Sequence, residues 1–270
     1  MEIAKKIVFI GSGNMAQAII SAILKSEMIK PENIICNDIV KERVDLLHEK
    51  FGVSIAVEKG VALVGADIIV LSVKPQNMKS VFDEIRSFIK SDAIIISIAA
   101  GIKTENIETG IGKKISVIRA MPNTPALTLS GATALCAGKY TRNEQMQKAK
   151  QLFSAIGKVE IQDESKFDAI TALSGSGPAY VFYLAQLMAQ AGEDLGLDKK
   201  IAQEFAAQTI YGAGKMLVET GVSAEELKLR VKSPNGTTEA ALNYFEEHNL
   251  KDIIFKAMEA AKNRSIELSK

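Results

Sequence analysis

The sequence is poor in the residues that build disulfide frameworks, metal sites and histidine-based catalytic centres. It has two cysteines, two histidines and no tryptophan in 270 residues. Cys36 and Cys136 are far apart and lack metal-ligand spacing, so we expect reduced core thiols and a cytoplasmic location. No H-x-x-x-H, C-x-x-C or G-x-S-x-G pattern occurs, which disfavours a metal site, a Ser/His/Asp triad and a histidine acid–base relay. His48 and His248 fall on polar faces of predicted helices and are expected to be solvated.

Excess charge and long apolar runs are also missing. Lys and Arg number 33 against 32 Asp and Glu, a formal net charge of +1, which gives no electrostatic case for nucleic acid or membrane partners. No apolar run approaches the roughly 18 residues of a membrane span, and the N-terminus has no apolar segment of a signal peptide. With 47% apolar residues, the composition indicates a soluble globular protein of one large or two modest domains.

The first apolar run leads directly into a glycine-rich turn and then into a helical pattern. Residues 6–16 read Lys-Ile-Val-Phe-Ile-Gly-Ser-Gly-Asn-Met-Ala, and apolar residues then recur at three- and four-residue steps to Leu24. Gly11 permits a tight turn, Gly13 lets the backbone approach a pyrophosphate, and Ala16 lets the helix pack closely on the strand. A glycine turn with a simple helix cap is the alternative. The strand before it and the helix after it favour a dinucleotide-binding site, with phosphate at the helix N-terminus.

Strands and helices alternate as far as residue 162. Helical patterns cover 44–51, 57–64 and 146–156, and another begins near Pro75 with a predicted buried face of Val81, Phe82, Ile85, Phe88 and Ile89. This alternation implies an α/β Rossmann domain over residues 1–162, with a doubly wound, mostly parallel sheet and right-handed crossovers. The predicted strands are residues 7–10, 34–38, 53–55, 67–72, 93–99, 115–119, 131–137 and 158–161.

From Ser165 onward only helical periodicity remains, so residues 163–270 are predicted to be an all-α domain. The helix predicted at 178–195 is apolar over much of its circumference, which is typical of a helix buried on several sides. Five helices in about a hundred residues offer little room to bury this helix on several sides within one chain. We therefore expect a homo-oligomer whose C-terminal helices pack together. A compact monomeric bundle is the alternative. The other predicted helices are 199–219, 224–229, 237–247 and 251–268.

Ligands of a parallel sheet bind outside the carboxyl ends of its strands. Four segments that follow predicted strands meet this condition. Their small residues and prolines suit a binding-site wall that lies beside a flat ring. For Met121–Pro125 a rigid connection is the alternative, and for Lys74 a solvated side chain. The predicted cofactor-binding residues are Gly11, Ser12, Gly13, Asn14, Met15, Asn37, Asp38, Ser72, Val73, Lys74, Pro75, Ala99, Ala100, Gly101, Met121, Pro122 and Asn123.

Two stretches in the helical half differ from ordinary packing sequence. Ser174-Gly-Ser-Gly-Pro178 offers an N-cap serine and a proline near N1, and its paired glycines let the backbone approach a ligand. Lys232-Ser-Pro-Asn-Gly-Thr-Thr-Glu239 opens another helix with free N–H groups and three hydroxyls, a suitable receptor for a small carboxylate. Capping alone is the alternative for both. The helix at 178–195 has no Lys, Arg or His, which argues against a hydroxyacid dehydrogenase that needs a positioned base.

Together these motifs resemble those of the pyrroline-5-carboxylate reductases, which make proline from its cyclic imine precursor. The resemblance spans essentially the whole chain and implies a Rossmann domain, a helical dimerisation domain, and dimers that assemble further, often into decamers. It also implies an active site completed by the partner chain, with the 233–238 turn on the substrate carboxylate and Thr238 beside the ring nitrogen. The implied substrate-binding residues are Ser176, Ser233, Asn235, Gly236, Thr237 and Thr238, with Thr238 as the catalytic residue and no metal. The motifs that carry the resemblance are 11–16, 73–76, 119–125, 168–180 and 233–238.

This sequence departs from the family pattern at two points. Asn235 stands where the family usually has glycine, but asparagine tolerates left-handed geometry, so the turn is expected to survive. Asp38 lies about 22 residues past Ala16, where an acid typically binds a ribose 2′-OH, which favours NADH. The family implies NADPH, and Lys41 and Arg43 could still reach its 2′-phosphate, so NADP(H) and NAD(H) both remain open.

The expected reaction is hydride transfer from the nicotinamide to the C=N carbon of 1-pyrroline-5-carboxylate, giving L-proline. The alternatives are a related imine or hydroxyacid reductase and, from another class, a non-catalytic NAD(P)-sensing protein.

Overall fold

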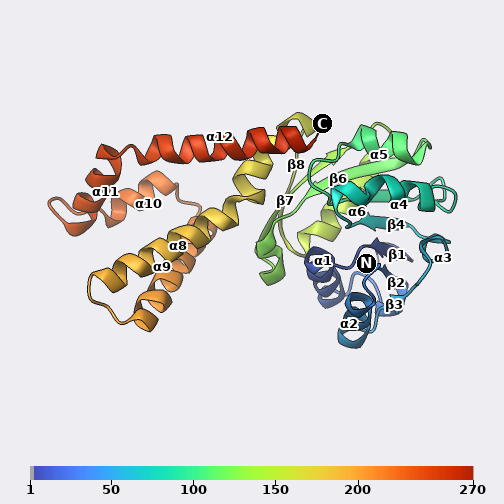
Figure 1. Ribbon diagram of the computed structural model, residues 1–270, viewed down its shortest axis with the longest axis horizontal. Coiled ribbons are helices and arrows are strands. Elements are labelled where there is room, and N and C mark those ends of the chain that lie inside the picture. Colours follow the sequence, from blue (N-terminus) through green and yellow to red (C-terminus); the bar gives the residue numbers. More distant parts are fainter. Residues whose placement is uncertain (1–2, 270) are drawn as a thin grey trace. The chain divides into compact units, whose positions relative to one another are not determined.

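The computed structural model describes residues 3–269, and the chain divides into two compact units (Figure 1). The sheet unit comprises Met1–Gly175 and Ala261–Lys270, and the helical unit comprises Ser176–Ala260. Strands give way to helices after Ile161, where the sequence analysis placed its boundary. Residues up to Gly175 nevertheless group with the sheet, because Phe167 is fully buried in a cluster with Ala134 and Cys136 of the sheet.

The sheet unit contains one eight-stranded sheet in the order β3-β2-β1-β4-β5-β6-β7-β8. Every neighbouring pair is parallel except β6 and β7, so the predicted doubly wound, mostly parallel sheet is confirmed. The strand order reverses at β1, between β2 and β4, and ligands bind at such a switch point. The strands are β1 (Ile7–Ile10), β2 (Ile34–Asn37), β3 (Ser54–Ile55), β4 (Ile68–Leu71), β5 (Ile94–Ser97), β6 (Ser116–Met121), β7 (Gly131–Ala137) and β8 (Gly157–Ile161).

Helices cover both faces of this sheet. Successive residues of β1 point to opposite faces, so Ile7 and Phe9 join one core and Val8 and Ile10 the other. The first core is completed by α1 (Asn14–Lys25), α2 (Lys41–Phe51) and α6 (Asn143–Ser154), and the second by α3 (Lys59–Leu63), α4 (Met78–Ile85) and α5 (Thr104–Ile111). The short helical segments are η1 (Pro31–Asn33), η2 (Pro75–Asn77), η3 (Thr124–Thr128), η4 (Glu164–Lys166), α7 (Phe167–Ile170) and the π-helical η5 (Thr171–Gly175).

Two details of the helices differ from the expectation. The sequence analysis did not predict α5, whose eight residues bury only Thr104, Ile107 and Ile111. Phe88 was expected on the buried face of the helix after Pro75, but it is 48% exposed. The reason is that α4 ends at Ile85, so the helical period no longer applies at residue 88.

The helical unit contains α8 (Gly177–Asp194), α9 (Lys199–Glu219), α10 (Ala224–Val231), α11 (Thr237–Glu247) and most of α12 (Leu250–Leu268). No strand follows Ile161 within residues 3–269, in agreement with the prediction. Ala189 of α8 and Ala202 and Ala206 of α9 are buried, whereas large apolar residues of α8 are exposed, Phe182 by 66%. Within one chain, therefore, α8 leaves much of its apolar surface uncovered.

Candidate functional site

A cleft of about 660 Å³ lies at the carboxyl ends of β1, β2 and β4, at the switch point of the sheet. It gathers predicted cofactor residues from three separate strands, as expected for parallel strands whose carboxyl ends meet at one edge. The predicted residues that line it are Gly11, Gly13, Asn14, Asn37, Asp38, Ser72, Val73 and Lys74. Ser12, Met15, Pro75, Ala99, Ala100, Gly101, Met121, Pro122 and Asn123 do not line this cleft.

The turn after β1 requires glycine at its first position. Gly11 has φ +96°, and a Cβ there would lie 2.5 Å from the carbonyl oxygen of Ser72 on the neighbouring β4–η2 connection. Gly13 is the N-cap of α1, no described side chain caps this helix, and a Cβ at Gly13 would meet nothing within 4 Å. The first N–H groups of α1 thus have no side-chain cap, and a phosphate can accept hydrogen bonds from such groups.

Asp38 braces this turn. Its Oδ2 accepts the main-chain N–H of Ser12 at 2.7 Å, and its Oδ1 accepts that of Val40 at 2.9 Å. Only 6% of the Asp38 side chain is exposed, and Nη1 of Arg43 lies 3.6 Å from Oδ2. A main-chain N–H thus bonds each oxygen of the Asp38 carboxylate.

Asn37 is also held by the protein. Its side-chain amide donates to the carbonyl oxygens of Ala56 at 2.8 Å and Val57 at 2.9 Å, so both amide hydrogens are used. Asn37 therefore fixes the connection after β3, and its amide nitrogen has no hydrogen left to donate to a ligand.

Basic residues from α2 and α3 reach the cleft. Arg43 lines it with a side chain that is 53% exposed, whereas Lys41 does not line it and forms an ion pair with Asp45 at 2.7 Å. Lys59 also lines the cleft and donates to Glu84 at 2.6 Å, a contact that lowers the pKa of the Glu84 carboxyl. Sequence reasoning missed Lys59 and Glu84 because 25 residues separate them and neither belongs to a motif.

A second group of predicted residues lies beyond the carboxyl ends of β5 and β6. Gly101 has φ +76°, and a Cβ there would lie 2.9 Å from the carbonyl oxygen of Leu268, so the end of α12 packs directly on this loop. Asn123 accepts the main-chain N–H of Ala132 at 2.9 Å and donates to the carbonyl oxygen of Ser174 at 2.9 Å. The Met121–Asn123 turn is thereby tied to β7 and to η5.

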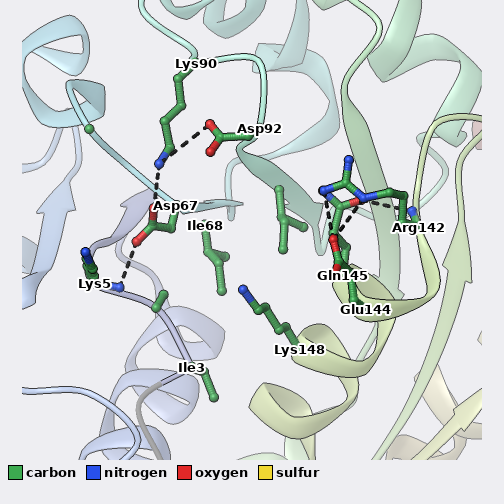
Figure 2. A pocket seen from close by; sticks show the side chains of 13 residues that line it. Ile3, Lys5, Asp67, Ile68, Lys90, Asp92, Arg142, Glu144, Gln145 and Lys148 are labelled. Atoms are coloured by element: carbon green, nitrogen blue, oxygen red, sulfur yellow. Dashed lines mark hydrogen bonds and ion pairs between the residues drawn. The ribbon is translucent and has the colours of Figure 1, made fainter.

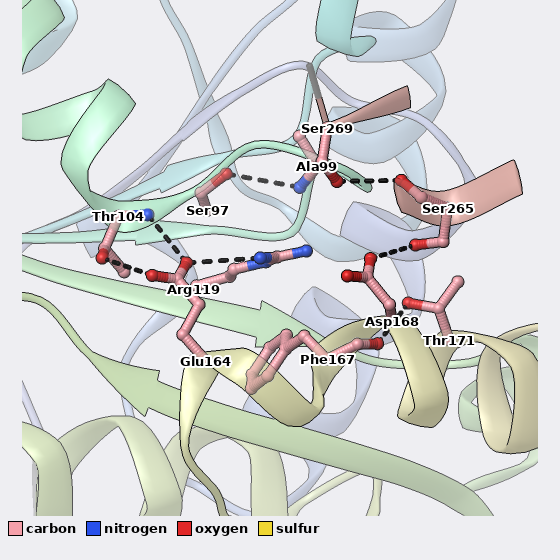
Figure 3. Close-up of polar contacts among 10 residues, drawn as sticks. All are labelled: Ser97, Ala99, Thr104, Arg119, Glu164, Phe167, Asp168, Thr171, Ser265 and Ser269. Atoms are coloured by element: carbon pink, nitrogen blue, oxygen red, sulfur yellow. Dashed lines mark hydrogen bonds and ion pairs between the residues drawn. The ribbon is translucent and has the colours of Figure 1, made fainter. Parts of the chain in front are cut away.

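Arg119 is the centre of a polar network that sequence reasoning did not find (Figure 3). It is only 3% exposed, its Nη1 lies 3.2 Å from Glu164 Oε1, and its guanidinium stacks on the Phe167 ring at 4.7 Å. Glu164 also accepts the main-chain N–H and the hydroxyl of Thr104, each at 2.9 Å. The network joins β6, η4, α7 and the start of α5.

The end of α12 joins the same region through Ser265, whose hydroxyl donates to Asp168 Oδ1 at 2.7 Å (Figure 3). Ser265 and Asp168 are 97 residues apart, and both belong to the sheet unit. This bond and the packing of Leu268 against Gly101 hold the end of α12 against the sheet unit.

Neither serine of the predicted ligand-binding stretch before α8 caps that helix with its side chain. Ser176 is the N-cap of α8, but no described side chain caps the helix, and the Ser174 hydroxyl donates to the Ile170 carbonyl at 3.1 Å. The segment Thr171–Gly175 is π-helical, an irregularity that is frequent at functional sites. The capping alternative is therefore not what the structure shows.

In the helical unit, the predicted substrate turn opens α11. Asn235 has φ +56°, so it adopts the left-handed geometry expected of it, and Gly236 packs so closely on Ser233 that a Cβ would overlap the serine hydroxyl. Glu239 Oε2 accepts the Asn235 N–H at 2.7 Å and Glu239 Oε1 lies 3.1 Å from Lys232 Nζ, contacts that lower the pKa of the Glu239 carboxyl. No described side chain caps α11, which leaves the N–H groups of its first turn available to an anion.

Another cleft, of about 680 Å³, lies at the opposite end of the sheet, beside the first residues of β4 and β5 (Figure 2). Asp67 is its best-connected residue. Its carboxylate accepts the main-chain N–H groups of Lys5 at 2.7 Å and Lys6 at 3.1 Å, and pairs with Lys90 at 2.5 Å. These contacts connect structural elements at the end of the sheet far from the glycine turn.

Comparison with known proteins supplies the family. Residues 164–268 match the family model described as pyrroline-5-carboxylate reductase dimerisation, and residues 6–101 match the model described as NADP oxidoreductase, coenzyme F420-dependent. A pyrroline-5-carboxylate reductase of Pseudomonas aeruginosa is 41% identical over 265 residues, which cover 98% of this chain and 97% of that protein. The chain belongs to the pyrroline-5-carboxylate reductase family. It is therefore an NAD(P)-dependent oxidoreductase.

Solved pyrroline-5-carboxylate reductases have the same fold. The structure from Coxiella burnetii is 38% identical, with a TM-score of 0.93 over 98% of this chain and 99% of that one. The Plasmodium falciparum structure, described with NADP bound, is 27% identical, with a TM-score of 0.88 over the full length of both chains. The predicted fold, a Rossmann domain followed by a helical dimerisation domain, is confirmed.

The family assignment explains why α8 has an uncovered apolar face. The dimerisation match includes the whole helical unit, so exposed apolar residues such as Phe182 lie in the part of the chain through which the family associates. None of the helices between residues 3 and 269 is long and apolar enough to cross a membrane. Over the same residues, no group of three or more His, Cys, Asp or Glu is arranged to hold a metal ion.

Proposed function

We propose that this pyrroline-5-carboxylate reductase family member reduces 1-pyrroline-5-carboxylate to L-proline, with NADPH as its preferred reductant. The proposal rests on nearly full-length likeness to curated enzymes of this activity, 35–41% identical across eight relatives. The carboxyl-edge cleft supports it independently, because its glycine turn leaves the α1 N-terminus open to a pyrophosphate.

In this proposal residues 1–162 form the dinucleotide-binding domain, and residues 163–270 form the domain for dimerisation and substrate binding. The first turn of α1 would hold the pyrophosphate, and the segments after β4, β5 and β6 would line the nicotinamide site. The bound cofactor supplies a hydride, and the protein supplies position and a polar environment. The proposed cofactor contacts are those of the predicted set, with the side chains of Asn37, Asp38 and Asn123 serving to hold the walls in place.

The substrate part of the site is proposed to come from a second copy of the chain. The free N–H groups at the start of α11 would hold the substrate carboxylate, and Ser176, Ser233, Asn235, Gly236 and Thr237 would shape the pocket. The Thr238 hydroxyl would lie beside the ring nitrogen. Because the imine is already protonated, hydride addition to its carbon leaves a neutral amine, and no side chain has to donate a proton. A homodimer is the smallest assembly that completes such a site, and a decamer would contain five of these dimers.

The preference for NADPH rests on the environment of Asp38. A buried carboxylate that accepts two main-chain N–H groups and lies beside a guanidinium has less freedom to grip a ribose hydroxyl. Arg43, in contrast, is half exposed in the same cleft and can turn to a 2′-phosphate. The NADP described in the Plasmodium relative agrees with this choice.

Steady-state assays test the proposal directly. Absorbance at the nicotinamide band should fall when 1-pyrroline-5-carboxylate is added to enzyme and NADPH, and kcat/KM should be at least about tenfold higher with NADPH than with NADH. Binding of NADPH without oxidation on addition of the imine would instead identify a sensing protein. Turnover with a 2-oxo acid but not with the imine would identify a hydroxyacid reductase.

A further inference from the structure

The Met121–Asn123 turn and the π-helical η5 lie far apart in the sequence but side by side in the sheet unit. The turn begins at the last residue of β6, at the carboxyl edge of the sheet, and η5 ends two residues before the first residue of α8. The side-chain amide of Asn123 donates to the Ser174 carbonyl at 2.9 Å across 51 residues. Gly175, which follows Ser174, also lies against the turn, since a Cβ on Gly175 would be 2.7 Å from Met121 Cε.

The two partners of Asn123 fix its orientation without ambiguity. The main-chain N–H of Ala132 is a donor and must meet the amide oxygen, at 2.9 Å, whereas the Ser174 carbonyl is an acceptor and must meet the amide nitrogen. The main-chain carbonyl of Asn123 also accepts the N–H of Ala126 at 3.1 Å. The Asn123–Ser174 hydrogen bond is thus a tie between two segments. Its Asn123 end is anchored in the core, because Ala126 is fully buried there beneath α1.

The other end of the tie is an irregular segment that needs support. A π-helix is rare and is seldom longer than a single turn. Asn123 is among the buried polar residues of the chain, whereas Ser174 is partly exposed, so the bond between them is partly buried. An amide in this place holds the π turn at a fixed distance from the turn after β6.

We propose that Asn123 is a positioning residue, which sets the distance between the turn after β6 and the segment that leads into α8, and does not bind the cofactor through its amide. The inference rests on the proposed function, in which these two segments flank the nicotinamide and the substrate. A hydride moves only over a short and well-aligned path, and a displacement of about 1 Å can lower the rate about a hundredfold. Asn123 acts on that alignment through Ser174.

Asn123→Asp is the sharpest test, since it is isosteric, keeps the acceptor for Ala132 and replaces the donor to Ser174 by a carboxylate oxygen. We expect kcat to fall about 10- to 100-fold, with the Kd for NADPH changed less than about threefold. Amides of residues 171–178 should exchange with deuterium at least about tenfold faster than in the wild type. Asn37→Asp is the matched control: it removes donors to two carbonyls in the same way, and exchange at 171–178 should stay unchanged.

Other outcomes would overturn the inference. If the Kd for NADPH rises as much as kcat falls while exchange at 171–178 is unchanged, Asn123 is a cofactor ligand. If kcat is unchanged and only the melting temperature drops, the tie is merely structural. A wild-type enzyme that fails to reduce the imine would defeat the proposed function, whereas the exchange and NADPH-binding measurements would still test the tie.

Gly175→Ala keeps the inference testable if the Asp variant does not fold. The new methyl group would press on Met121 Cε, the mobile end of a flexible side chain, so a milder loss of about two- to fivefold in kcat is expected, again with NADPH binding retained. An Ala variant with normal kcat and unchanged exchange at 171–178 would contradict a role for this contact in alignment.

Discussion

The Asp38 carboxylate accepts the main-chain N–H of Ser12 at 2.7 Å, so the acid at the end of β2 holds the glycine turn at the end of β1. The position of Asp38 in the sequence indicates a ribose ligand, and the structure gives it a second task. The same carboxylate holds the loop whose neighbouring N–H groups are proposed to bind the pyrophosphate. A substitution at this position therefore acts on the loop as well as on any ribose contact.

Asp38→Ser is expected to raise KM for NADPH and for NADH alike. Loss of a hydrogen bond changes a free energy by about 1 kcal/mol, or about fivefold in an equilibrium constant, and the loosened turn serves both cofactors. Parallel kinetics with the two reductants measure this. If KM rises for NADH alone and falls for NADPH, Asp38 acts by reading the ribose hydroxyl and its bond to Ser12 is incidental.

Arg43→Ala is expected to separate the two cofactors. An arginine bonded to a phosphate contributes about 1.5–3 kcal/mol, so kcat/KM with NADPH should fall roughly 10- to 100-fold, while the value with NADH should change less than about twofold. Lys41→Ala is the matched control, because Lys41 is also exposed on α2 but pairs with Asp45 and does not line the cleft. Equal losses with both cofactors would show that Arg43 does not contact a 2′-phosphate.

The sequence sufficed for those features whose causes are local. The glycine turn follows from the order of strand, Gly11, Gly13 and helix, and the left-handed Asn235 follows from the tolerance of asparagine for positive φ. The helices after residue 165 follow from apolar periodicity. By contrast α5 was missed, because its eight residues include Gly110 and only a short apolar repeat.

What the sequence did not give are the contacts between distant residues. Arg119 and Glu164 are 45 residues apart, and no spacing rule joins a strand arginine to a glutamate after β8. Asn123 illustrates the same limit: its place after a strand suggested a cofactor ligand, yet its amide bonds Ala132 and Ser174. Residue type and position predict where a site lies, whereas the partner of each polar group depends on how the chain folds back.

Association through the helical unit is expected in solution. Light scattering at micromolar concentration should show at least twice the chain mass of 29.1 kDa. Phe182→Asp places a charge on the exposed apolar face of α8 and should shift the protein towards monomer, with imine reduction lost in parallel because the partner's turn is removed. Lys200→Glu, at an exposed charged position of α9, should change neither the assembly state nor the rate of imine reduction. A wild-type protein that scatters as a monomer and still turns over would contradict a shared site.

Asp67 should make stability depend on pH at the acid end. Burial alone would raise its pKa, but hydrogen bonds from Lys90, Lys5 and Lys6 outweigh it and hold the pKa below the ordinary 3.8. A carboxyl whose pKa is lower in the folded state contributes its full stabilisation at a pH above its unfolded-state pKa. This contribution disappears as the pH falls through its folded-state pKa. Urea midpoints should therefore decline below about pH 4, and less steeply in Asp67→Asn. Identical slopes in the two proteins would mean that other carboxyls dominate the acid transition.

Thr238 is the residue on which the proposed chemistry depends most directly. It is the second residue of α11, within the uncapped first turn that would hold the substrate carboxylate, so its hydroxyl can face the same small ring. A hydrogen bond to a charged group contributes about 1.5–3 kcal/mol, and Thr238→Ala should accordingly lower kcat/KM for the imine roughly 10- to 100-fold. NADPH binding and assembly should stay as in the wild type. Thr238→Val retains the β-branched shape and should be equally impaired, whereas Thr238→Ser retains the hydroxyl and should recover most of the activity. If Val restores activity where Ala does not, Thr238 serves to pack the turn, and the contact to the ring nitrogen belongs to another group.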